Sequence, residues 1–60
     1  MKLWIARDFD GKLALHTQKP YCPFYTWYSG DEVALNEELF PEVTFENSPQ
    51  QVELKLVDKV

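Results

Sequence analysis

The chain has 60 residues and a formal charge of −4, and 45% of its residues are hydrophobic. Its length predicts one domain, residues 1–60. No apolar run reaches the roughly 20 residues of a membrane-spanning helix, and the apolar start is shorter than the about 7–15 residues of a secretory signal. A single cysteine excludes an intramolecular disulfide. We therefore expect a small soluble protein in the cytoplasm, with a core so limited that a second copy could contribute to its stability.

The first predicted element is a β-hairpin. Residues 2–7 and 12–16 both alternate large apolar residues with others, which is the period of a strand. A three-residue loop, 9–11, pairs Ile5 with Leu15 and keeps the leucines of both strands on one face. A two-residue loop would separate them. The predicted turn is therefore of type I with a bulge, and Gly11 is left-handed.

An aromatic segment follows a proline-rich connection. Pro20 and Pro23 each lack a backbone donor, which makes a central strand unfavourable between them. Residues 24–28 are almost wholly aromatic, and such residues favour strands. We predict a strand here, ended by the Ser29-Gly30 pair.

Residues 31–40 allow two interpretations. As a helix, the segment starts at an Asp31 N-cap and stops before Pro41. Alternatively, residues 32–35 form a short strand, and Asn36 caps one helical turn at 37–40. Propensity alone slightly favours the helix.

The last third of the chain predicts two further strands. Residues 43–46 form the first. Residues 51–57 form the second, with Val52, Leu54 and Leu56 on its inner face.

Three sequence pieces carry a resemblance. They are Trp4-Ile5-Ala6-Arg7-Asp8 with Asp10-Gly11, then Leu39-Phe40-Pro41-Glu42-Val43-Thr44, and Val52-Glu53-Leu54. Together they resemble short proteins of gut Bacteroidales genomes and of their phages and prophages. The resemblance implies a cytoplasmic setting and a mobile-element origin, and it carries over no activity. In similar sequences the segment before the Leu-Phe-Pro piece reads as a strand that runs into one short turn, which favours the strand at 32–35.

The predicted fold is therefore mainly β. We expect a small antiparallel sheet or partly open barrel of about five strands with one short helical turn. The alternative is an α+β fold with a helix at 31–40.

The residues that could carry chemistry are few. Cys22 and His16 are the only cysteine and histidine of the chain. A structural zinc site needs about four ligands, so we expect no metal and no cofactor. Cys22 has no base near it in the sequence, and we expect His16 to be partly exposed and packed on Trp4. Acidic pairs such as Asp8/Asp10 are explained by turns. The sequence predicts no catalytic residues, and the protein is not expected to be an enzyme.

An aromatic face is the predicted functional feature. We place Trp4, His16, Tyr25 and Trp27 on the face opposite the leucines, where so apolar a surface is unusual for a solvated one. The predicted function is binding to a protein partner or to a second copy of the chain. The alternative is a phage-type sponge that stacks a small nucleotide on these aromatics. The acidic charge argues against duplex nucleic acid, and no membrane partner is expected.

Overall fold

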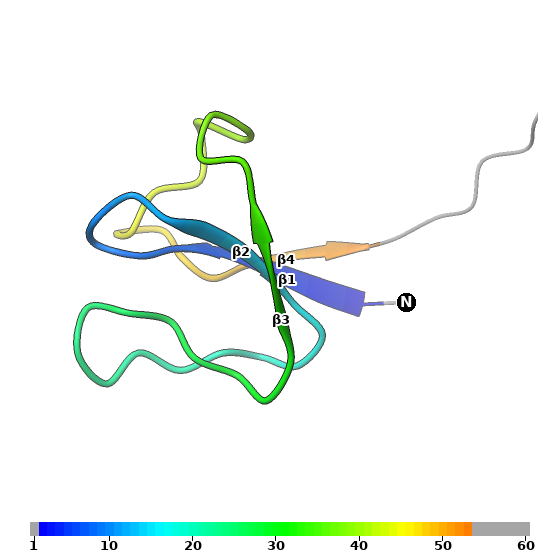
Figure 1. The fold of residues 1–60 in the computed structure, drawn as a ribbon. Coiled ribbons are helices and arrows are strands. Elements are labelled where there is room, and N and C mark those ends of the chain that lie inside the picture. Colours follow the sequence, from blue (N-terminus) through cyan, green and yellow to red (C-terminus); the bar gives the residue numbers. More distant parts are fainter. Residues whose placement is uncertain (1, 54–60) are drawn as a thin grey trace, which may run out of the picture.

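The computed structural model describes residues 2–53 as one open, four-stranded antiparallel sheet. Its strands are β1 (Lys2–Arg7), β2 (Leu13–His16), β3 (Glu32–Leu35) and β4 (Gln50–Glu53), in the order β3-β2-β1-β4 (Figure 1). The mainly β prediction is confirmed. Residues 2–53 contain no helix, so the α+β alternative with a helix at 31–40 is wrong.

The hairpin has the predicted register. Ile5 pairs with Leu15 and Arg7 with Leu13. The Asp8 N–H donates to the Lys12 carbonyl over 2.7 Å, which leaves Phe9, Asp10 and Gly11 as the three-residue loop. Gly11 has a φ of 101°, so the left-handed bulge is confirmed. The odd loop length places Leu3, Ile5, Leu13 and Leu15 together on one face of the hairpin.

The pairing gives the sheet two chemically different faces. The first, which we call the leucine face, carries these apolar residues: Leu3, Ile5, Leu13, Leu15, Val33, Leu35 and Val52. The second, which we call the tryptophan face, carries Trp4, Ala6, Ala14 and His16. Both faces are apolar, so each needs a cover to keep it from water.

Two irregular segments supply that cover. Residues 17–31 lie beneath the sheet (Figure 1), and Ser29 of this segment contacts the ring of His16 on the tryptophan face. Residues 36–49 place Val43 against Ile5 and Leu13 on the leucine face, where all three are buried.

The predicted strand at 24–28 is wrong. Tyr21 and Tyr28 form an isolated pair that closes residues 21–28 into a loop, with bonds of 2.8 and 2.7 Å in the two directions. Tyr25 has a φ of 61°, which no strand residue adopts. The backbone of this loop bonds to itself and to the hairpin tip, and these contacts override the strand propensity of its aromatic residues.

The predicted strand at 43–46 is also wrong, because side chains make a turn there. Thr44 and Asn47 bond each other's backbone N–H groups, at 2.8 and 3.2 Å, and the Ser48 hydroxyl donates to the Thr44 carbonyl. Such local bonds compete with a strand ladder.

The elements around these segments agree better with the prediction. Strand β3 matches residues 32–35, and Asn36 caps a single turn: its Oδ1 accepts from the Glu38 N–H, and its carbonyl accepts from the Leu39 N–H. Strand β4 begins one residue before the predicted strand at 51–57. Residues 54–57 of that prediction lie outside the described part of the chain.

Arg7 ties the hairpin to the segment that follows β3. Its Nε donates to the Val43 carbonyl over 2.6 Å, and its two terminal nitrogens donate to four more carbonyls, those of Gly11, Glu37, Leu39 and Phe40. All five guanidinium N–H donors are thereby used. A single cation thus bonds four carbonyls of the segment after β3, of which that of Phe40 also accepts from the Val43 N–H.

Candidate interaction surface

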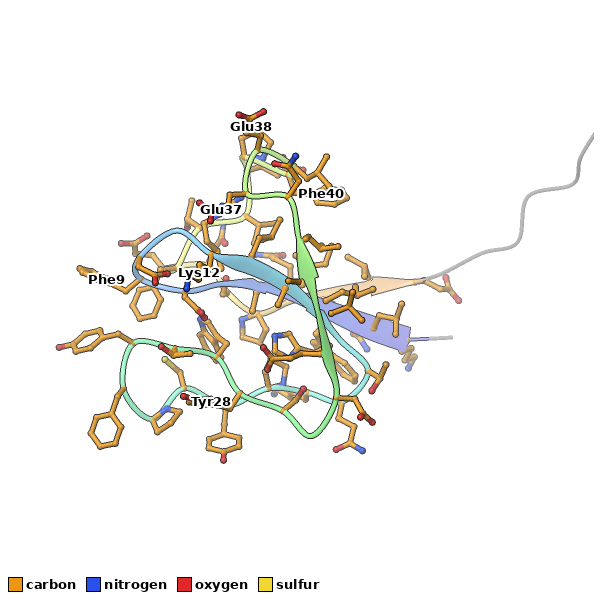
Figure 2. The ribbon with its side chains drawn as sticks, viewed as in Figure 1. Phe9, Lys12, Tyr28, Glu37, Glu38 and Phe40 are labelled. Carbon is orange, nitrogen blue, oxygen red and sulfur yellow. The ribbon has the colours of Figure 1, made fainter. Side chains whose placement is uncertain are left out.

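A group of exposed aromatic side chains is the clearest functional candidate. They are Phe9, Tyr21, Phe24, Tyr25 and Tyr28, which we call the aromatic surface. Phe9 is 67% exposed at the hairpin tip, and Phe24 is 83% exposed in the covering loop. In Figure 2, Phe9 lies at the hairpin tip and Tyr28 projects from the loop beneath the sheet. Single exposed apolar residues are ordinary, but five aromatics from two neighbouring segments are not.

The aromatic surface rests on a supporting cluster. The ring of Phe45 lies edge-on to Phe9, with centroids 5.5 Å apart, and it also contacts Tyr25 at 6.1 Å and Trp27 at 6.3 Å. Phe9 and Tyr25 contact each other at 5.3 Å. These separations are within the range of favourable aromatic pairs. Phe45 and Trp27 are half-buried, so they hold the exposed rings in place.

Backbone bonds fix the loop against the hairpin tip. The Phe9 N–H donates to the Tyr25 carbonyl over 3.0 Å, and Asp8 Oδ1 accepts from the Trp27 N–H over 2.8 Å. Tyr25 is 66% exposed and left-handed, a conformation that glycine or asparagine adopts at lower cost. Strained exposed residues of this kind concentrate at binding sites.

The four residues that the sequence predicts for an aromatic face are not on one exposed face. Trp4 pairs with His16 across the hairpin, as predicted, but Trp4 is half-buried and His16 has 0% of its surface exposed. The expectation of a partly exposed His16 is wrong because the 17–31 loop covers it. Tyr25 belongs to the aromatic surface, and Trp27 lies in the cluster beneath it.

The buried His16 has a defined hydrogen-bond arrangement. The Ser29 hydroxyl donates to the Asp31 carbonyl over 2.7 Å, so its oxygen accepts from His16 Nδ1 at 2.8 Å. This places the proton on Nδ1. Nε2 is buried and has no partner among the described residues. Burial lowers the pKa of His16, and Glu32, whose Oε1 lies 4.0 Å from Nδ1, opposes that shift together with Asp8.

The described residues offer little else for chemistry. Residues 2–53 hold no group of three or more histidine, cysteine, aspartate or glutamate side chains placed to bind a metal ion. Cys22 is a half-buried free thiol. Asp10 acts in the turn, since its Oδ1 accepts from the Lys12 N–H at 3.1 Å, whereas Asp8 also holds the covering loop. Residues 2–53 contain no helix that is long and apolar enough to cross a membrane.

Sequence reasoning did not assign Phe9, Phe45, Tyr21, Phe24 or Tyr28 to the site. Phe9 offered one signal, since a large aromatic is out of place in a tight hairpin loop where polar residues and glycine dominate. The exposure of Tyr21, Phe24 and Tyr28 depends on the path of residues 17–31, and the position of Phe45 depends on that of residues 36–49. No local pattern reveals either path.

Comparison with known proteins adds no further evidence: no family model, no curated protein and no solved structure matches this chain.

Proposed function

We propose that this chain is a non-enzymatic interaction protein of the cytoplasm that binds a protein partner through its aromatic surface. The observation that carries the proposal is the exposure of five aromatic side chains on one loop and the adjoining hairpin tip. Aromatic residues are enriched where proteins bind each other, because they bury a large area and lose little conformational freedom.

The supporting cluster strengthens this proposal. A binding surface works best when its contact residues are held in place before the partner arrives. Here Phe45 and Trp27 pack beneath Phe9 and Tyr25, and two backbone bonds join the loop to the hairpin. Two of the five exposed rings, Phe9 and Tyr25, are therefore held in place by this support.

The nucleotide alternative has weaker support. Stacked nucleotides need cationic groups for their phosphates. All five donors of Arg7 are used by backbone carbonyls, which leaves the exposed Lys12 as the cation at the hairpin tip that could meet a phosphate. The sheet has two hollows that could receive a small ligand, and no residue of the aromatic surface lines either of them. If a panel of nucleotides at millimolar concentration raised the melting temperature and quenched tryptophan fluorescence, the nucleotide function would replace the one proposed.

Site-specific photo-crosslinking in a gut Bacteroidales host, the setting that the resemblance implies, tests the proposal. A photoreactive phenylalanine replaces Phe24 in one version of the full chain and the exposed Glu38, which is distant from Tyr28 in Figure 2, in the control. We expect a discrete protein adduct from position 24 that a second change, Phe9→Ser, reduces strongly. Equal adducts from both positions, or none from position 24, would contradict the proposal.

A further inference from the structure

The leucine face carries an open groove that the covering segment does not fill. Two hollows of about 420 Å³ each lie on this face and share Ile5, Phe40 and Val52 in their walls. The second hollow also contacts Leu35 of β3, Leu15 of β2 and Leu3 of β1. We call the combined depression the leucine groove. It crosses all four strands, so it could receive a segment lying across the whole sheet.

The lining of the leucine groove specifies what chemistry it can bind. Its floor is aliphatic, and Phe40 forms one wall while remaining 42% exposed. The charged residues among the lining residues are Glu42 and Glu53, both acidic. A complementary segment therefore presents apolar side chains together with lysine or arginine.

The sequence after the last described residue has this chemistry. Glu53 lines the groove, and the chain continues as Leu54-Lys55-Leu56-Val57-Asp58-Lys59-Val60, with four apolar residues and two lysines. Seven residues reach about 24 Å when fully extended, and four strands are about 14 Å wide between the outer two. The segment is long enough to cross the sheet.

We propose that the leucine groove binds residues 54–60 of a second copy of this chain, reciprocally, in a two-fold dimer. Binding to the chain's own groove would require a reversal directly after Glu53, and residues 54–57 contain none of the glycine, proline or asparagine residues that favour reversals. A second copy needs no such reversal, and a symmetric exchange fills both grooves. The bound segment would then bring its two lysines near the acidic residues of the lining, Glu42 and Glu53.

Charge reversal tests this pairing with full-length chains. The groove variant is Glu42→Lys/Glu53→Lys, and the segment variant is Lys55→Glu/Lys59→Glu. Each alone places like charges together, so we expect the dimer to weaken at least about tenfold in sedimentation equilibrium. Mixing the two variants places opposite charges at both grooves. We therefore expect a heterodimer to form from two proteins that associate poorly by themselves.

A second pair of variants separates this interface from the aromatic surface. Leu54→Ser/Leu56→Ser removes apolar side chains from the segment, and we expect a monomer. Phe24→Ser changes the aromatic surface, and we expect the dimer to persist. Tryptophan fluorescence checks folding, because Trp4 and Trp27 lie away from the groove.

Three results would overturn the proposal. The first is a monomeric unmodified chain at 100 μM, a concentration at which a dimer with a Kd of about 1 μM would be nearly complete. The second is a dimer that survives Leu54→Ser/Leu56→Ser, since the interface would then be elsewhere. The third is the absence of heterodimer on mixing, which would indicate binding within one chain or no binding.

Discussion

Gly11 illustrates how one residue sets the register of the hairpin. Its φ of 101° is accessible to glycine and strained for other residues, while a Cβ built there would approach no closer than 3.9 Å to Glu37 Oε1. The cost of Gly11→Ala is therefore conformational, and we expect it to destabilise the fold by about 1 kcal/mol in urea unfolding. Gly30→Ala is the control, because Gly30 has similar space and no such φ. If both variants lost the same stability, the left-handed bulge would not be the reason.

His16 makes stability depend on pH. Burial lowers its pKa in the folded protein, whereas in the unfolded chain the pKa is near 6.5. The unfolded state therefore binds more protons below that pH, so the free energy of unfolding falls as pH decreases from about 6.5 through the folded pKa. Above pH 7 this contribution is fully present.

Urea unfolding at pH 8, 7, 6 and 5.5 measures the effect. One proton changes the free energy of unfolding by at most about 1.4 kcal/mol per pH unit. The slope should disappear in His16→Gln, which does not titrate in this range. A slope that His16→Gln retained would assign the pH dependence to other groups.

At the scale of elements, Arg7 joins β1 to the segment after β3. Its planar guanidinium reaches five carbonyls at once, and lysine has three donors on a single nitrogen. We expect Arg7→Lys to cost about 2–3 kcal/mol, since each lost bond leaves a carbonyl without its charged partner. Amide hydrogen exchange at Val43 should also become faster, because the carbonyls of Val43, Leu39 and Phe40 lose their bonds to the guanidinium of Arg7.

Lys12→Ala provides the matched control for Arg7→Lys. Lys12 is an exposed cation at the same hairpin. Its hydrogen bonds to Asp8 and Asp10 are made by its backbone carbonyl and N–H, so they do not depend on the side chain. We expect a change within about 0.5 kcal/mol. If Arg7→Lys, which keeps the positive charge, cost no more stability than Lys12→Ala, then charge rather than the five hydrogen bonds would explain the role of Arg7.

The elements that could be predicted are those with local causes. Alternating residues and an Asp-Gly turn specify the β1–β2 hairpin, and Asn36 ends β3 by accepting a hydrogen bond from the backbone N–H of Glu38. The 21–28 loop could not be predicted because its partners, Asp8 and Phe9, are distant in sequence. For the same reason the sequence singled out an aromatic segment but did not distinguish exposed Phe24 from supporting Trp27.

At the scale of the whole molecule, one thin sheet separates two different surfaces. The covering loop and hairpin tip present aromatic rings on one side, and the leucine groove opens on the other. A domain of this size buries a modest share of its surface, so both surfaces are available without a second layer of regular structure. Under the two proposals above, this separation would let a partner and a second copy bind at the same time.

Phe45 connects the parts that lie on the two sides. It belongs to the segment after β3, yet its ring contacts Phe9 of the hairpin and Tyr25 and Trp27 of the covering loop. Removing a well-packed aromatic ring costs about 3–5 kcal/mol in a full core. Because Phe45 is half-buried, we expect Phe45→Ala to cost roughly 2–3 kcal/mol. Urea unfolding followed by both tryptophan fluorescence and far-ultraviolet circular dichroism measures this loss.

Phe24→Ala is the control for Phe45→Ala, since it removes the same ring from a position that is 83% exposed. Its stability should stay within about 0.5 kcal/mol of the unmodified chain. The two optical signals should also change together in Phe45→Ala if the ring holds the whole molecule as one cooperative unit. Separate transitions would show that the covering loop unfolds independently of the sheet, and the aromatic surface would then not be held in place by its support.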